Sequence, residues 1–134
     1  MADLPSIPPG LAATAHQRVT PAATAGQVGS GSVDVLSTPE LVRLMEMTAV
    51  AALAGQLPVG YTTVGSAISV EHLAPTPVGM DVTVTATLTQ VQGRRLTFDV
   101  TAHDEVEEIG RASHNRVIID LAKFMARANA KSGA

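Results

Sequence analysis

The hydrophobic pattern of this 134-residue chain changes from helical to alternating near Tyr61, and this change limits the possible folds more than any other feature. Before it, residues 37–54 (STPELVRLMEMTAVAALA) repeat apolar side chains at helical spacing. After it, apolar residues alternate with polar ones, most regularly in residues 80–91, where valine, alanine and leucine alternate with threonine. One long helix followed by closely spaced strands predicts an α+β fold, in which an antiparallel sheet wraps around a central helix.

The predicted helix has recognisable start and stop signals. Ser37 can cap the first turn, Pro39 fits that turn because its missing N–H has no partner there, and Glu40 completes a capping box. Gly55 follows the last periodic residue and ends the helix. Glu46 is one of only two strongly polar residues beyond the first turn, so we expect the helix to be buried over most of its surface.

Alternation and turn residues predict the remaining elements. The expected strands are residues 10–20 (the least regular), 62–73, 80–91, 94–103 and 108–120, and a short terminal helix is expected at 121–130. The long helix is the only element able to cover the apolar face of the sheet. Residues 21–32 (PAATAGQVGSGS) predict a flexible loop. We expect a flexible lead-in at 1–9, a single domain at 10–130 and a flexible tail at 131–134.

Composition and charge exclude several classes of function. The net charge is −3 and aromatic residues make up 2%, which argues against nucleic-acid binding. There is no cysteine for a disulfide, no apolar run long enough to cross a membrane and no signal-peptide pattern, so a cytoplasmic protein without membrane contact is expected. The acidic turn at residues 103–108 lacks metal-ligand spacing, and we expect neither a metal nor a bound cofactor. A small aliphatic core of this kind is often supplemented by self-association.

Glu46 is the first candidate functional residue, because it lies in the middle of the apolar helix. A buried carboxylate without a partner costs several kcal/mol or takes up a proton, so it needs a partner or a cavity. In the alternative interpretation, the helix is rotated so that Glu46 reaches solvent or pairs with Arg43. Periodicity alone favours neither interpretation.

His72 and Thr38 are candidates because of where they lie on their elements. His72 ends a predicted strand, and strand-to-loop junctions hold side chains on rigid backbone beside open space. Thr38 lies in the first helical turn, where backbone N–H groups and the positive end of the helix dipole favour a developing oxyanion. The structural alternatives are a hydrogen-bonded or exposed histidine at the strand end and a helix-capping threonine.

Gly65 and Arg116 interrupt strands that otherwise read as regular. Gly65 lies inside a predicted strand, which implies a bulge or the close approach of a ligand or another backbone. Arg116 lies in the apolar segment HNRVII and needs either an acidic partner or an anionic ligand. An outward-facing salt bridge is an equally good explanation of Arg116.

Four segments together carry a family resemblance. They are LMEMTAVAAL (44–53), GSAISVEHLAPTPVGMDVTVTATL (65–88), VQGRRLTFDVTAHDEVEEIG (91–110) and SHNRVII (113–119). In this order they resemble the fluoroacetyl-CoA thioesterase-like family of hot-dog-fold proteins, over residues 38–123. The resemblance implies a hot-dog fold, a homodimer whose sheets join edge to edge, and acyl-CoA sites at the subunit interface. Whether such dimers pair into tetramers is left open by the sequence.

The resemblance also implies roles for individual residues. It places the family's catalytic threonine, glutamate and histidine on Thr38, Glu46 and His72. It places a strand glycine that approaches the thioester carbonyl on Gly65, and a late-strand, substrate-binding arginine on Arg116. Thr38 and Glu46 are eight residues apart, a little over two helical turns, so their side chains leave the helix on similar faces.

The activity implied is hydrolysis of a short or medium acyl-CoA, with CoA as part of the substrate. In the fluoroacetyl-specific enzyme an aromatic-bearing lid precedes the helix, whereas residues 24–37 here (TAGQVGSGSVDVLS) contain no Phe, Tyr or Trp. We therefore expect no selectivity for a fluorinated acyl group. Glu46 can act as nucleophile or as general base. The alternative function is a non-catalytic protein that binds acyl-CoA or another small ligand, and an enoyl-CoA hydratase ranks behind both because no hydratase-type Asp/His motif is present.

Overall fold

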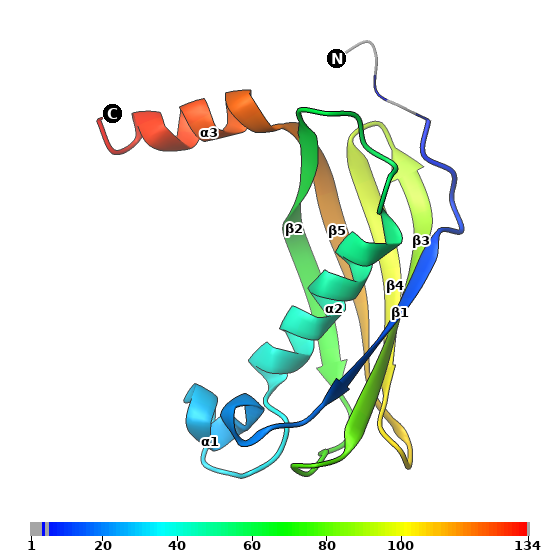
Figure 1. Cartoon of the computed structure of the whole chain (residues 1–134), viewed down its shortest axis with the longest axis vertical. Helices are drawn as coiled ribbons and strands as arrows, with labels where there is room; N and C mark the ends of the chain where they lie inside the picture. Colours follow the sequence, from blue (N-terminus) through cyan, green and yellow to red (C-terminus); the bar gives the residue numbers. More distant parts are fainter. Residues whose placement is uncertain (1–3, 5, 134) are drawn as a thin grey trace.

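The structure is a computed structural model that describes Leu4 and residues 6–133 (Figure 1). Its elements are β1 (Ala12–Arg18), the 3-10 helix η1 (Pro21–Ala23), α1 (Ala25–Val28), α2 (Thr38–Ala52), β2 (Tyr61–His72), β3 (Asp81–Gln92), β4 (Arg95–His103), β5 (Glu108–Asp120) and α3 (Leu121–Ala130). Each predicted strand and both predicted helices begin and end within two residues of these bounds.

The strands form one antiparallel sheet in the order β1-β3-β4-β5-β2, and α2 lies across one face of it (Figure 1). The two edges of the sheet are therefore β1 and β2, which are distant in the sheet although each flanks the helix in sequence. The α+β prediction, with a sheet wrapped around a long central helix, is confirmed.

The core lies between α2 and the inner face of the sheet, as the alternation predicts. The inward-facing residues of β3 and β4 are at most 1% exposed: Val82, Val84, Ala86, Leu88, Leu96, Phe98, Val100 and Ala102. The helix contributes Leu41, Met45 and Ala49, each with no exposed surface. The start of α2 is also as predicted, because the Ser37 side chain accepts a hydrogen bond from the Glu40 N–H, an N-cap that stabilises a helix by about 1 kcal/mol.

Gly110 on β5 lies where the helix packs tightly against the sheet. A Cβ atom at this residue would lie 2.9 Å from Leu41 Cδ2 and 3.3 Å from Met45 Cε. Side chains in a packed core cannot accept a contact of 2.9 Å without moving, so the absence of a side chain at Gly110 allows α2 to lie this close.

The helix is less buried than predicted. Met47 is 51% and Val50 48% exposed, and together with Arg43 they form an uncovered stripe on the side of α2 that faces away from the sheet. The prediction of a mostly buried helix was wrong because the sheet covers only one side of α2, and no other described element covers the opposite side.

The prediction of a flexible loop at residues 21–32 was also wrong. Pro21 begins η1, Thr24 caps α1 by accepting from the Gln27 N–H, and Gly29 ends α1 with a positive φ of 91°. Backbone bonds from Ala25 N to Val35 O and from Gly26 N to Val33 O tie this segment to the residues before α2. The segment is built from consecutive hydrogen-bonded turns, which need no apolar periodicity.

The two ends of the chain differ in how they pack. The predicted lead-in at 1–9 lies partly outside the described residues, but within it Ile7 is 4% exposed and belongs to the core. Helix α3 projects past the β2 edge and buries none of its residues (Figure 1). No helix in the described part of the chain is long and apolar enough to span a membrane.

Candidate functional site

Thr38 and His72 meet where α2 begins and β2 ends. The Thr38 hydroxyl and His72 Nδ1 are hydrogen-bonded at 2.7 Å. Both line a hollow of about 380 Å³ whose other walls are small or aliphatic, including Ala25, Val33 and Val35 from the segment before the helix. We call this the helix-start hollow. It brings together two of the residues that the sequence singles out.

The second ring nitrogen of His72 points into protein. Its Nε2 is buried and has no hydrogen-bond partner among the described residues. Burial lowers the pKa of the His72 imidazole, so the neutral ring is favoured. A neutral imidazole held through Nδ1 by a hydroxyl has Nε2 as its remaining site for proton exchange, and within a single chain this nitrogen is covered.

Glu46 lies two turns further along α2, beside β5 and the edge strand β2. Its Oε2 is 3.9 Å from Arg116 Nη1, and its side chain is 43% exposed. Both residues line a second hollow of about 410 Å³, together with Met47 and Val50 of the exposed helix stripe. We call this the mid-helix hollow. Glu46 therefore reaches solvent, but it does not pair with Arg43, which instead donates to Glu40.

Arg116 is buried, with 6% of its surface exposed, so the outward-facing interpretation was wrong. Its Nε donates to the Thr63 hydroxyl at 2.9 Å and its Nη2 to the Thr63 carbonyl at 3.1 Å. Burial lowers the pKa of the guanidinium, while the charge of Glu46 raises it. A buried guanidinium with an adjacent carboxylate can hold a polarised carbonyl or an anion beside that carboxylate.

Gly65 lies at a bulge and under the charged pair. The β2–β5 register shifts between Gly65 and Ala67, so the first of the two explanations offered for this glycine, a bulge, is present. A Cβ atom on Gly65 would lie 3.3 Å from Arg116 Nη1, 3.3 Å from His114 Cε1 and 3.5 Å from Glu46 Oε2. The missing side chain keeps open the space that these three groups border.

His114 was missed by the sequence analysis. It is 1% exposed, and its Nε2 lies 3.2 Å from Arg116 Nη1. The segment SHNRVII contained a signal: its alternation places His114 and Arg116 on the same face as buried Ile118, so two polar residues interrupt an apolar face.

Within one chain, the two groups of candidates are separate. Thr38 and Glu46 are about 12 Å apart along the helix axis at 1.5 Å per residue. The two hollows share no lining residue. One copy of the chain thus presents a hydroxyl–imidazole pair in one place and a carboxylate–guanidinium pair in another.

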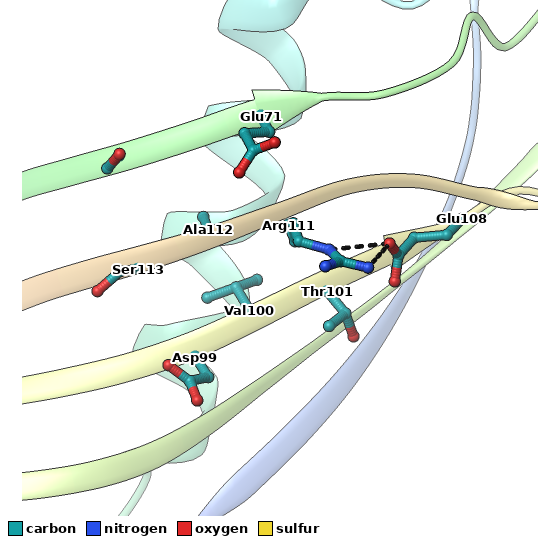
Figure 2. Close-up of a pocket in the computed structure, with 9 residues that line it drawn as sticks. Glu71, Asp99, Val100, Thr101, Glu108, Arg111, Ala112 and Ser113 are labelled. Atoms are coloured by element: carbon teal, nitrogen blue, oxygen red, sulfur yellow. Dashed lines mark hydrogen bonds and ion pairs between the residues drawn. The ribbon is translucent and has the colours of Figure 1, made fainter.

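Two further features show no comparable chemistry. Figure 2 shows a hollow on the face of the sheet away from α2, where Arg111 donates to Glu108 beside Glu71 and Asp99. In the acidic turn, Asp104 accepts from the N–H groups of Val106 and Glu107, a structural role. In the described part of the chain, no group of three His, Asp or Glu side chains has the geometry of a metal site.

Comparisons with known proteins agree with this architecture. The fluoroacetyl-CoA thioesterase of Streptantibioticus cattleyicolor is 48% identical over 101 residues, which cover 75% of this chain and 73% of that protein. A crystal structure of a variant of the fluoroacetyl-CoA-specific thioesterase FlK, in complex with fluoroacetate and CoA, superposes with a TM-score of 0.83 at 40% identity, covering 88% of this chain and 99% of that one. A thioesterase superfamily member from Thermus thermophilus superposes with a TM-score of 0.89 at 30% identity, covering 96% and 95%.

The antiparallel sheet with its single long helix is thus the fold of the hot-dog thioesterases. The family model described as fluoroacetyl-CoA-specific thioesterase matches residues 19–122, and the chain belongs to this family of thioester hydrolases.

Proposed function

We propose that this protein hydrolyses short or medium acyl-CoA thioesters to the free acid and CoA, without selectivity for a fluoroacetyl group. The observation that carries the proposal is the carboxylate of Glu46 beside buried Arg116, over the open space at Gly65. Family membership supports thioester hydrolysis, and the related FlK variant was solved with fluoroacetate and CoA bound.

The reaction uses the two pairs of residues differently. Glu46 either removes a proton from water, so that the hydroxide attacks the thioester carbonyl, or attacks the carbonyl itself to form an anhydride that water then cleaves. The Gly65 backbone and Arg116 stabilise the developing oxyanion. When the C–S bond breaks, neutral His72, oriented by Thr38, donates a hydrogen bond to the departing CoA sulfur, and the proton released by the attacking water ends on that sulfur.

The segment before α2 supports a substrate without fluorine selectivity. Its wall of the helix-start hollow is made of Ala25, Ser30, Gly31, Val33 and Val35, which are small or aliphatic. No aromatic ring is present there to distinguish a fluoromethyl from a methyl group. An acyl chain of several carbons is therefore expected to fit at least as well as a fluoroacetyl group.

We further propose a cytoplasmic homodimer joined through the β2 edges, in which each site combines the helix-start hollow of one copy with the mid-helix hollow of the other. Two features support the dimer: β2 is an open edge strand, and the exposed stripe containing Met47 and Val50 lies on α2 with nothing over it. A cytoplasmic location follows from the substrate, because CoA thioesters are made and used inside cells.

The test compares Glu46→Ala with a control, Glu71→Ala, which deletes a carboxylate on the opposite face of the sheet. Release of free thiol is followed with acetyl-CoA, butyryl-CoA and fluoroacetyl-CoA. Glu46→Ala should lower kcat by roughly 10²–10⁴-fold, the range for loss of an acid–base or nucleophilic group, and Glu71→Ala should leave it unchanged. Unchanged turnover in Glu46→Ala would refute the proposal. Acetyl-CoA that raises the Tm of the wild type without releasing thiol would instead show a binding protein.

A further inference from the structure

His114 is an unusual residue for the inner face of this sheet. It projects from β5 toward the core between the positions of Ala112 and Arg116 and is 1% exposed. A buried imidazole is costly unless both of its nitrogens have partners. Both do: Nδ1 lies 2.9 Å from the Ala67 carbonyl oxygen, and Nε2 lies 3.2 Å from Arg116 Nη1.

These two partners determine where the proton on His114 lies. A carbonyl oxygen only accepts and a guanidinium only donates, so Nδ1 carries the hydrogen and Nε2 carries the lone pair. Burial lowers the pKa of His114, and the positive charge of Arg116 lowers it further. The hydrogen bond to Ala67 and the charge of Glu46 raise it, but the net effect is a lowered pKa. A second proton would lie on Nε2 and point at the guanidinium.

The lone pair of His114 completes a set of contacts that fixes Arg116. Thr63 on the neighbouring strand accepts from Nε and Nη2 and so holds one edge of the planar guanidinium. The contact of Nη1 with His114 holds the other edge and keeps the whole plane from tilting. Nη1 is the atom nearest Glu46 Oε2, and it lies 3.3 Å from the Cβ position of Gly65. His114 thus acts on the one Arg116 nitrogen that faces the mid-helix hollow.

We propose that His114 is a positioning residue: its Nε2 lone pair orients the Arg116 guanidinium so that Nη1 faces Glu46 and the space over Gly65. The proposal rests on the proposed thioesterase function. It assigns His114 no contact with the reacting atoms, since both ring nitrogens are engaged, by the Ala67 carbonyl and by Arg116.

Two substitutions separate the roles of the two ring nitrogens. In His114→Asn the amide nitrogen can replace Nδ1 and donate to Ala67, but nothing accepts from Arg116. In His114→Gln the amide oxygen can replace Nε2 and accept from Arg116, but the bond to Ala67 is lost. Ile118→Val is the control for packing, because Ile118 is the next inward-facing residue after Arg116 on β5 and is also buried.

The kinetic measurement is thiol release from acetyl-CoA, with kcat and KM determined separately. Losing a hydrogen bond to a charged group should lower kcat/KM of His114→Asn about tenfold or more, with the larger change in kcat. His114→Gln should retain activity within about threefold of wild type, and Ile118→Val should match wild type whatever its Tm. Equal loss in both His114 variants, or no loss in His114→Asn, would overturn the proposal.

A spectroscopic measurement tests the positioning role of His114 independently of turnover. Nitrogen-15 NMR of the wild type should show His114 as the neutral Nδ1–H tautomer, and separate Arg116 Nη1 and Nη2 signals because rotation is restricted. These signals should average in His114→Asn and stay separate in His114→Gln. If wild type releases no thiol, the proposed function fails, and the NMR result alone supports or overturns the positioning role. An Nε2–H tautomer in the wild type would overturn it.

Discussion

The helix-start hollow and the mid-helix hollow lie on the same helix but are assembled by different means. The first joins the ends of two elements: Ser37 caps the helix, Thr38 follows it, and β2 ends at His72, which bonds to Thr38. The second depends on contacts between distant parts of the sequence, because Thr63 on β2 and His114 on β5 together fix Arg116 against a carboxylate from α2. The two hollows are of similar size, about 380 and 410 Å³.

The comparison shows that neither hollow of a single chain holds a complete set of hydrolytic groups. The helix-start hollow has a proton donor and acceptor in His72 but no carboxylate. The mid-helix hollow has Glu46 and Arg116 but no imidazole free to exchange a proton, because both nitrogens of His114 are engaged. The predictions below test whether the two hollows serve one reaction.

The largest effect is expected from combining two inactive variants. Glu46→Ala and His72→Asn should each lower thiol release from acetyl-CoA by roughly 10²-fold or more. If a site takes Glu46 from one copy and His72 from the other, a mixed dimer of the two variants keeps one intact site of two and recovers about half of the wild-type rate. Co-expression with two affinity tags isolates the mixed dimer.

The control is a dimer isolated with the same two tags in which both copies carry Glu46→Ala, and it should stay inactive. If the mixed dimer of different variants is as inactive as the single variants, both hollows act within one chain, and the sharing of sites between copies is wrong. A single chain in solution at assay concentration would have the same consequence.

A smaller effect should come from filling one hollow at a time with a methyl group. The methyl of Gly65→Ala would meet Arg116, His114 and Glu46 at 3.3–3.5 Å, so at least one reactive group must move, and we expect about a tenfold lower kcat. Gly31→Ala places a methyl 3.3 Å from the Ala25 side chain, away from Thr38 and His72, and should change kcat less than twofold. Equal effects on kcat would show that the two hollows are equally tolerant.

The smallest effect is on the pH dependence of stability. Burial lowers the pKa of both His72 and His114, so the unfolded chain binds protons at pH values where these residues are neutral in the folded chain. The free energy of unfolding should therefore rise with pH between the folded-state pKa and about 6.5, and be flat below that window. Each residue contributes a slope of at most about 1.4 kcal/mol per pH unit.

Urea unfolding between about pH 5 and pH 8 measures this dependence. Because His114 is almost fully buried and His72 borders an open hollow, His114→Gln should flatten the curve more than His72→Gln. The opposite ranking would mean that His72 is more strongly desolvated than His114.

The sequence predicts the elements well because each is encoded locally. The cap at Ser37, the alternation of residues 80–91 and the glycine at the β2 bulge are all visible in a few consecutive residues. The exposure of Met47 could not be predicted, since a helical pattern shows which side chains are apolar but not whether anything covers them. Residues 21–32 were misjudged because four-residue α1 is too short to show a period.

The candidate site is harder to predict from the sequence, because its contacts join residues of different elements. Thr38, Glu46 and His72 can be singled out by their types and positions, and family resemblance gives them roles. Thr63, the partner of Arg116 on β2, is 53 residues away from it in the sequence, so no local pattern reveals this contact. His114 was overlooked because a single histidine beside an arginine carries little meaning until the packing around both is known.

Gly110 shows how a backbone position on β5 bears on the placement of Glu46. A Cβ atom there would lie within 3.3 Å of Leu41, Met45 and the Glu71 carbonyl oxygen, and Leu41 and Met45 precede Glu46 on α2 by five residues and by one. A side chain at position 110 would require Leu41 and Met45 to change conformation or α2 to shift, and a shift of α2 would change the 3.9 Å separation of Glu46 and Arg116. The geometry of this charged pair can therefore be adjusted from a glycine that lines neither hollow.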